Sequence, residues 1–151
     1  MTLVEHVTTT RRTINRLMTA RLAKRSARSL VQLRALRVLT EAASVTQTEL
    51  AARLLVDTAA VSRMIASLES EGLVERSAGR DRRSVHLKIT PAGRAEARVL
   101  DRELKKLDRE VQAHLTAEEV KTFVTLISRV NAALLQGGDY GDPTAATQKR
   151  P

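Results

Sequence analysis

The chain has no cysteine and no tryptophan, and Phe123 and Tyr140 are the only phenylalanine and tyrosine among its 151 residues. Without thiols it forms neither disulfides nor thiolate metal sites, and it offers an oxidant no cysteine to modify. Proteins that bind RNA or single-stranded DNA stack unpaired bases on aromatic side chains, which are almost missing here. These absences exclude cysteine-based redox sensing and argue against base stacking as a binding mode.

Other familiar signals are also absent. No apolar run is long enough to span a bilayer, and the first residues, MTLVEHVTTTRRT, lack the apolar core of a signal peptide. We therefore predict a cytoplasmic protein with no membrane partner. The three histidines are dispersed without metal-ligand spacing, so we predict no metal and no cofactor. Because phosphate-binding glycine loops and nucleophile elbows are missing too, we predict that the chain is not an enzyme.

Positive charge is present in excess. Lysine and arginine number 26 against 17 acidic residues, which gives a net charge of +9. This imbalance favours polyanionic partners, nucleic acid before anionic membrane, although a basic surface that only serves solubility remains an alternative. The charges are not uniform: residues 94–110 interleave six basic and five acidic side chains. That interleaving predicts a solvated helix with ion pairs between successive turns.

Residues 46–72 carry the pattern of two consecutive helices. Thr46 and Glu49 form a predicted capping box, which begins a short helix. Asp57 is the predicted N-cap of the next helix, and Gly72 suits the position just after its end. A short helix, a tight turn and a second helix together make a helix-turn-helix.

A β-hairpin is predicted directly after these helices. Residues 73–76 are short and strand-like, and a polar loop follows in which residues 77–83 read SAGRDRR. The next segment alternates strictly, so it predicts a strand with Val85, Leu87 and Ile89 inward and His86 and Lys88 outward. A hairpin with such a cationic tip is suited to gripping the DNA backbone beside an inserted helix.

Amphipathic helices flank this central region. Residues 3–27 hold apolar side chains at helical spacing, and residues 30–43 are nearly continuous in Leu, Val and Ala. Two further helices begin at Thr90-Pro91 and at a capping box that starts with Thr116. The terminal helices carry more apolar surface than one small helix-turn-helix domain covers, and burial against a second copy of the chain is the simplest resolution.

Two segments resemble the MarR family of winged-helix regulators. The first is Thr48–Arg76, TELAARLLVDTAAVSRMIASLESEGLVER, and the second is Gly79–Arg94, GRDRRSVHLKITPAGR. The second contains the family's Asp-x-Arg wing signature, an alternating strand and a Thr-x-x-Gly-Arg restart. With these motifs at this spacing, the resemblance covers about residues 20–136.

The resemblance implies a mainly α fold with a small β-hairpin wing, in which terminal helices form a homodimer. Accordingly we predict an N-terminal dimerisation helix (1–28), a winged helix-turn-helix DNA-binding domain (29–94), C-terminal dimerisation helices (95–136) and a disordered tail (137–151). A two-fold dimer places its winged domains on a palindromic operator, about one helical turn of DNA apart or a multiple of it.

Candidate DNA-binding residues follow in three groups. On the recognition helix they are the small or polar residues of its N-terminal half, which would meet base edges in the major groove: Thr58, Ala59, Ser62 and Arg63. Small polar residues favour helix starts in any case, and Arg63 can hold a phosphate instead of a guanine. In the wing the resemblance implies that Arg83 enters the minor groove while Asp81 fixes its guanidinium. Arg80, Arg82 and Lys88 are predicted phosphate contacts.

The remaining candidates lie outside the recognition helix and the wing. The amides at Thr46 and Gln47 are candidates for holding a DNA phosphate, although Thr46 also serves as a cap. Family members commonly bind an aromatic or phenolic effector, so Arg16, Arg21 and Arg34 are candidates for the rim of a pocket for a small anionic or aromatic ligand. The alternative for these arginines is a solvated helix face.

Taken together, these features predict a sequence-specific regulator that binds double-stranded DNA. We predict a ligand-responsive repressor that acts as a homodimer on a palindromic operator. Two alternatives remain open: a winged-helix protein-interaction module, and an activator that counteracts other DNA-coating proteins.

Overall fold

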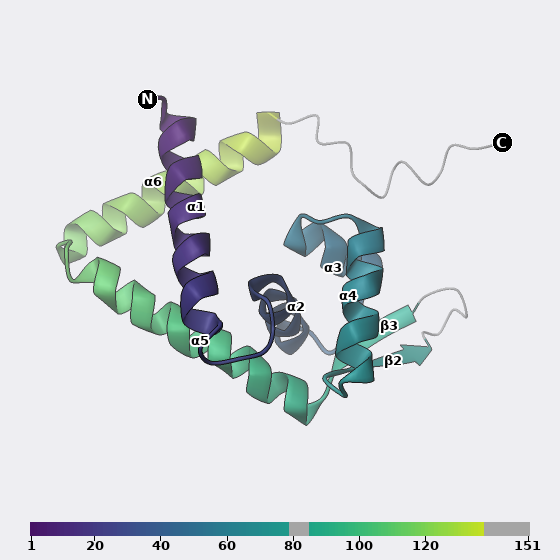
Figure 1. Cartoon of the computed structure of the whole chain (residues 1–151). Coiled ribbons are helices and arrows are strands. Elements are labelled where there is room, and N and C mark those ends of the chain that lie inside the picture. Colours follow the sequence, from purple (N-terminus) through teal and green to yellow (C-terminus); the bar gives the residue numbers. More distant parts are fainter. Residues whose placement is uncertain (79–84, 138–151) are drawn as a thin grey trace. The chain divides into compact units, whose positions relative to one another are not determined.

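The computed structural model describes residues 1–78 and 85–137. The described chain is mainly helical with a small antiparallel sheet, as the sequence predicted (Figure 1). Its elements in order are α1 (Leu3–Leu22), α2 (Leu30–Glu41), β1 (Val45–Thr46), α3 (Gln47–Leu54), α4 (Thr58–Ser70), β2 (Val74–Ala78), β3 (Val85–Ile89), α5 (Pro91–Gln112) and α6 (Ala117–Gly137). The chain divides into two compact units, 1–104 and 105–151, and the division falls within α5.

Reciprocal capping boxes begin four helices of the described chain. In each, a Ser or Thr hydroxyl accepts a hydrogen bond from the backbone amide three residues on, whose side chain accepts one in return. The pairs are Thr2 with Glu5, Ser29 with Gln32, Thr46 with Glu49, and Thr116 with Glu119. The last two confirm predictions from the sequence. The hydrogen bonds also lower the pKa of the three glutamates, because they stabilise the charged carboxylate.

The turn between α3 and α4 has an unusual backbone. Leu55 follows α3 in the left-handed conformation, at φ 55°, and its side chain is 92% exposed. Asp57 then caps α4, and its Oδ1 accepts a hydrogen bond from the amide of Ala60 at 2.7 Å. This confirms the predicted helix-turn-helix and the predicted cap.

The sheet has the strand order β1-β3-β2, and all of its pairs are antiparallel. Leu87 of the central strand lies opposite Val45 of β1 and Arg76 of β2, and it is fully buried. The prediction that Val85 points inward was wrong, since its side chain is 40% exposed. Val85 pairs with Ala78 at the hairpin end of the strand, two residues from the buried Leu87.

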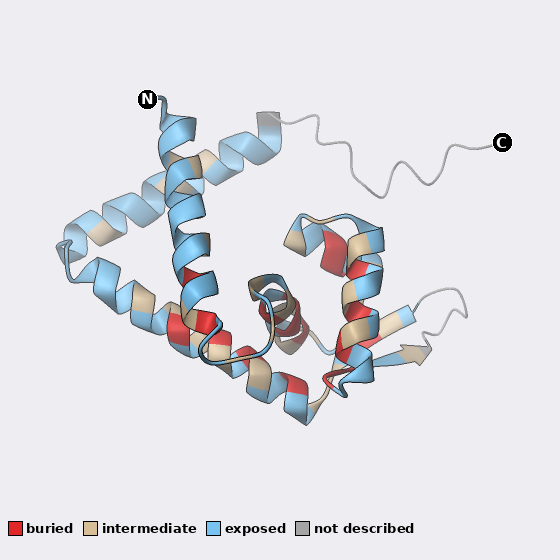
Figure 2. Ribbon diagram, viewed as in Figure 1, coloured by how far each residue is buried: buried red, intermediate tan, exposed pale blue. Residues whose placement is uncertain are grey.

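The hydrophobic core lies in unit 1 (Figure 2). Its largest fully buried side chains come from α1, α2, α3, α4, β1, β3 and α5: Met18, Leu22, Leu33, Leu36, Leu39, Val45, Leu50, Val61, Ile65, Leu68, Leu87 and Leu100. Burying an aliphatic side chain of this size contributes about 1.5–3 kcal/mol, so this cluster dominates the stability of the unit. Ile14 and Leu17, which share the predicted apolar stripe of α1, are 39% and 36% exposed instead.

The start of α5 is fixed tightly to the turn that follows α4. The Thr90 hydroxyl donates to the Gly72 carbonyl at 2.7 Å and accepts from the Gly93 amide at 3.0 Å. The Thr90 amide donates to the carbonyl of Leu73 at 3.1 Å. Gly93 is buried, and a Cβ there would lie 2.2 Å from the Leu73 carbonyl oxygen. Gly72 has φ 71°, which suits its predicted place after the helix end.

The first half of α5 differs from the solvated helix that its charge pattern predicted. Glu103 is buried, and its Oε1 lies 3.7 Å from Nε of Arg25 in the connection between α1 and α2. Asp101 pairs with Arg37 of α2 at 3.1 Å. The acids of this segment therefore pair with other elements, because the helix lies against the core on one side.

Within residues 1–78 and 85–137, no helix is both long and apolar enough to cross a bilayer. In the same part of the chain, no three His, Asp or Glu side chains gather closely enough to hold a metal ion. The predicted tail lies, apart from Gly137, outside the described residues.

Candidate nucleic-acid interface

The outward face of α4 brings the predicted recognition residues together. Val61, Ile65 and Leu68 are fully buried and fix the helix against the core. Five exposed side chains lie outside this stripe: Ala59 and Arg63 opposite it, Ser62 and Ala66 beside that pair, and Thr58 at the first turn, on the stripe's own side. Ala66 was not among the predicted residues, although its spacing of four from Ser62 indicates the same face. Among the described residues no carboxylate forms a salt bridge with Arg63, so its guanidinium is available to an anionic ligand.

The second predicted DNA contact is at the start of α3. Thr46 accepts from the Glu49 amide at 3.2 Å, and its own amide donates to Oε2 of Glu49 at 2.7 Å. These bonds make Thr46 a cap, which is the alternative that the sequence left open for it. Gln47 is half-buried at the first position of the helix.

Thr46→Ala should destabilise unit 1 by about 1 kcal/mol, because the Glu49 amide loses its cap. The folded-state pKa of Glu49 lies below its ordinary value of 4.5, chiefly through the backbone hydrogen bond from Thr46. Glu49 therefore adds stability above the ordinary pKa, and this contribution is lost as the pH falls through the depressed one. Thr46→Ala also weakens the hydrogen bonding that stabilises the charged Glu49 carboxylate. The difference in free energy of unfolding between wild type and variant should therefore shrink at acidic pH. Urea unfolding at neutral pH and at about pH 3 measures both effects.

The exposed Thr48, two residues further along the same helix, provides the matched control. Thr48→Ala removes a hydroxyl of the same size without touching the cap. Equal losses for Thr46→Ala and Thr48→Ala, or a deficit that stays constant with pH, would contradict the assigned cap.

The described part of the wing carries polar side chains on both strands, and the predicted contact Lys88 is on β3. Lys88 is exposed and lies opposite Glu75 of β2 in the sheet register. His86 is half-buried, and its Nδ1 lies 3.2 Å from the Ser44 hydroxyl, within hydrogen-bond distance. The predicted wing residues Arg80, Asp81, Arg82 and Arg83 lie outside the described residues.

The predicted effector residues lie on α1 and α2. The Nη2 of Arg34 donates to Oδ1 of Asn15 at 2.7 Å, which joins the two helices. Partial burial, and then the neighbouring Arg11 guanidinium, lower the pKa of Arg34. Arg16 is exposed and Arg21 is half-buried. The hollow described next is lined by none of these residues, so their role as a ligand site stays a prediction.

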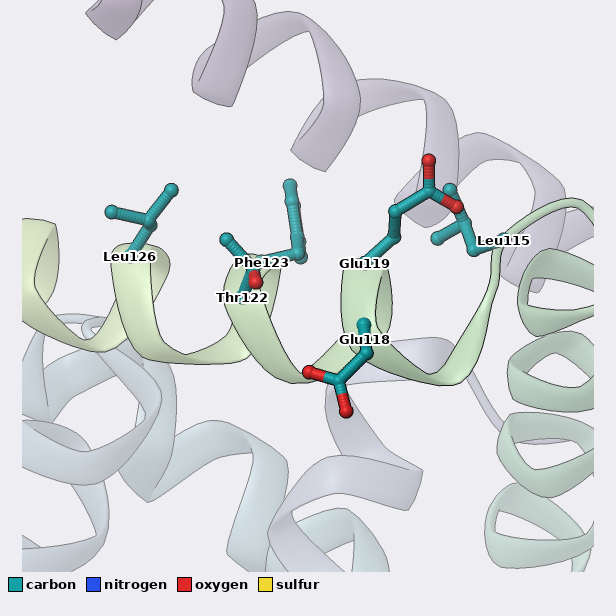
Figure 3. Close-up of a pocket in the computed structure, with 6 residues that line it drawn as sticks. All are labelled: Leu115, Glu118, Glu119, Thr122, Phe123 and Leu126. Atoms are coloured by element: carbon teal, nitrogen blue, oxygen red, sulfur yellow. The ribbon is translucent and has the colours of Figure 1, made fainter.

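Unit 2 exposes a large apolar surface. None of residues 117–136 of α6 is buried, and Phe123 and Leu126 are 59% and 50% exposed. Both project from one side of the helix into an open hollow of about 380 Å³, whose other lining residues are Leu115, Glu118, Glu119 and Thr122 (Figure 3). Leu134 and Leu135 expose 51% and 80% of their surface further along. A monomer rarely leaves so much contiguous apolar surface in water, so this face is a candidate for a protein interface.

A family model of the MarR family matches residues 29–85, from the start of α2 to the start of β3. The crystal structure of a mutant MarR from E. coli complexed with operator DNA is 31% identical, with a TM-score of 0.74, and the match covers 85% of this chain and 92% of that one. The chain belongs to the MarR family. Members of this family are transcriptional regulators rather than enzymes, as the sequence predicted.

Two curated relatives of this MarR family chain come from Bacillus subtilis (strain 168), and both are described as uncharacterized HTH-type transcriptional regulators. YdgJ is 29% identical over 100 residues, which are 66% of this chain and 61% of YdgJ. YwhA is 30% identical over 96 residues, which are 63% of this chain and 69% of YwhA. The match thus spans less than two thirds of YdgJ. These relatives support the regulator assignment and leave the regulated genes open.

Proposed function

We propose that this MarR family regulator binds double-stranded operator DNA in a sequence-specific manner through α4. The observation that carries the proposal is the outward face of α4, where Ser62 and Arg63 lie exposed outside the buried stripe. Small side chains allow close approach to base edges, and a free guanidinium can bind guanine with two hydrogen bonds. The excess of positive charge would add attraction to phosphates. As a DNA-binding regulator it would act in the cytoplasm.

The homodimer is the second part of the proposal. The exposed apolar face of α6 and the half-exposed Ile14 and Leu17 of α1 would be covered by a second copy. This supports dimerisation roles for residues 1–28 and 95–136, with residues 29–94 as the DNA-binding domain. Two-fold symmetry then favours a palindromic operator, since each half-site meets the same surface.

We also propose repression through promoter occlusion and control by a small anionic or aromatic effector. The support for the effector is electrostatic. Partial burial, and then the neighbouring Arg11 guanidinium, lower the pKa of Arg34, and a bound anion would offset both effects. Arg16 and Arg21 of α1 remain the other candidate residues.

The proposed function is tested by selecting from a random pool of DNA duplexes with the purified full-length chain. We expect enrichment of a palindromic sequence that binds tightly in the presence of random competitor. A plot of log affinity against log salt should have a slope of several units, at about −0.9 per phosphate neutralised. Equal competition by random duplex would leave only nonspecific DNA coating. If nothing binds even at low salt, DNA recognition fails and the protein-interaction alternative takes first place.

Arg83→Ala should weaken binding to the selected operator by about 1–3 kcal/mol, the range for one good base-level contact. The reason is the proposed insertion of the Arg83 guanidinium into a narrow minor groove, whose negative potential rewards it. Fluorescence anisotropy with labelled operator measures the loss, and size-exclusion chromatography should show an unchanged dimer. Lys24→Ala removes an exposed cation in the α1–α2 connection and provides a matched change of net charge. Equal effects of the two substitutions would remove the wing assignment.

A further inference from the structure

The connection between α1 and α2, residues 23–29, reaches acids on two other elements. The Ser26 hydroxyl donates to Oε2 of Glu96 in α5 at 2.7 Å. Arg28 forms an ion pair through its Nη1 with Oε2 of Glu71, the residue that ends α4. The Arg28 amide also donates to the Ser26 hydroxyl at 3.0 Å, which fixes the connection locally. The connection thus joins the recognition helix to α5.

The Arg28–Glu71 pair is partly sheltered from solvent. The side chains are only 22% and 29% exposed, and Oε1 of Glu71 accepts a second hydrogen bond from the Ser67 hydroxyl at 3.2 Å. Solvent screens such a pair less than it screens an exposed one, and removal of one partner leaves the other charge poorly solvated. Among the salt bridges of the described residues, the one between Arg28 and Glu71 links the C-terminal end of α4 to the segment that follows α1.

The α1–α2 connection contacts α4 at its C-terminal end, where Glu71 is the C-cap residue. Besides Arg28, the start of α5 is fixed there through Thr90, which bonds both Gly72 and Leu73. The exposed residues proposed to read DNA lie in the opposite half of the helix. A helix of this length extends for about 20 Å, so a tilt of about 5° at the fixed end moves the other end by nearly 2 Å. Hydrogen bonds to bases tolerate a displacement of only about 0.5 Å.

We propose that Arg28 and Glu71 are positioning residues, which fix the orientation of α4 and thereby set both operator affinity and the preferred spacing of the two half-sites. The inference rests on the proposed DNA-binding function and assigns no DNA contact to either residue. The Arg28–Glu71 pair also couples α1 to the recognition helix, because residues 23–29 follow α1 directly. A change in how α1 is held is therefore transmitted to α4 through Arg28.

A charge-reversal cycle in the full-length chain tests this proposal. Arg28→Glu and Glu71→Arg alone should each weaken binding to the selected operator by roughly tenfold, and the double exchange should restore affinity to within about threefold. The exchange leaves net charge unchanged, so recovery cannot come from general attraction to DNA. The control pair is Arg37 and Asp101, which joins α2 to α5 at 3.1 Å without touching α4. Arg37→Glu should cost stability without a matching loss of affinity.

Half-site spacing provides the readout that a merely structural role would not change. Operators with one base pair inserted or removed at the centre should lose less affinity with Arg28→Glu than with wild type, whereas Arg37→Glu should keep the wild-type preference. If charge reversal prevents folding, Arg28→Gln and Glu71→Gln provide milder variants, for which roughly threefold losses are expected. Unchanged affinity and spacing preference in the folded variants, or no recovery in the double exchange, overturns the inference. A wild-type chain that binds no duplex overturns the proposed function, and this inference with it.

Discussion

Gly93→Ala should destabilise unit 1 by about 2–3 kcal/mol, the cost of overpacking a rigid site. The new methyl group would lie 2.2 Å from the Leu73 carbonyl oxygen and 2.8 Å from Cγ1 of Ile89. A flexible side chain could move aside, but the carbonyl belongs to the backbone between α4 and β2. The first turn of α5 would therefore have to move away from Leu73, which would disturb the hydrogen bonds that Thr90 makes there.

Urea unfolding followed by far-UV circular dichroism measures this loss, at one fixed protein concentration because the proposed dimerisation would contribute to stability. Gly72→Ala is the matched control. A Cβ on Gly72 meets nothing within 4 Å, but the residue has φ 71°. We expect that control to cost about 1 kcal/mol through backbone strain alone. If both substitutions lower the free energy of unfolding equally, the backbone around Leu73 moves aside easily. The close packing of α5 against Leu73 would then not be important for stability.

Phe123→Asp should shift the proposed dimer toward monomer by a factor of at least about a hundred. In a two-fold interface each substitution occurs twice, and each exposed aromatic anchor contributes on the order of 1.5–3 kcal/mol when it becomes covered. A buried carboxylate without a partner adds a further penalty. Since a monomer engages only one half-site, operator affinity should fall steeply as well. Analytical ultracentrifugation across a concentration series measures the dissociation constant directly.

Thr125→Asp is the control for the same helix. Thr125 is exposed, lies two residues from Phe123 and is not among the residues that line the hollow. Its replacement adds the same charge on another face of α6, and we expect the dimer to persist. If Phe123→Asp leaves the dissociation constant unchanged, the α6 face is not the dimer interface, and the covering partner must be sought elsewhere.

Features with a local physical cause were predicted well from the sequence. The caps at Thr46, Asp57 and Thr116 depend on residues three positions apart, so a short window contains all the information. The buried stripe of Val61, Ile65 and Leu68 follows from helical spacing alone. That stripe also predicted which side of α4 faces outward, and the recognition residues on it stay a prediction.

Features that depend on tertiary contacts were missed or wrongly predicted. The burial of Glu103 requires Arg25, which is 78 residues away along the chain, and no window of sequence contains both. The ion pair between Arg28 and Glu71 also joins residues far apart in the sequence. The prediction for Val85 failed because strand alternation tells which face a side chain takes, but not where the covering helices end. The role of Gly93 becomes visible only when the carbonyl of Leu73 is in place.

The helix-turn-helix contains a residue that works against its own stability. Leu55 holds a left-handed backbone, which costs a side-chain-bearing residue roughly 1–2 kcal/mol, and its apolar side chain gains nothing from burial. Natural proteins are retained once they pass a stability threshold, so such positions persist when the core is sufficient. Leu55→Gly would raise the free energy of unfolding without changing any buried contact. Position 55 is thus a place where this lineage can gain tolerance for costly changes on the outward face of α4.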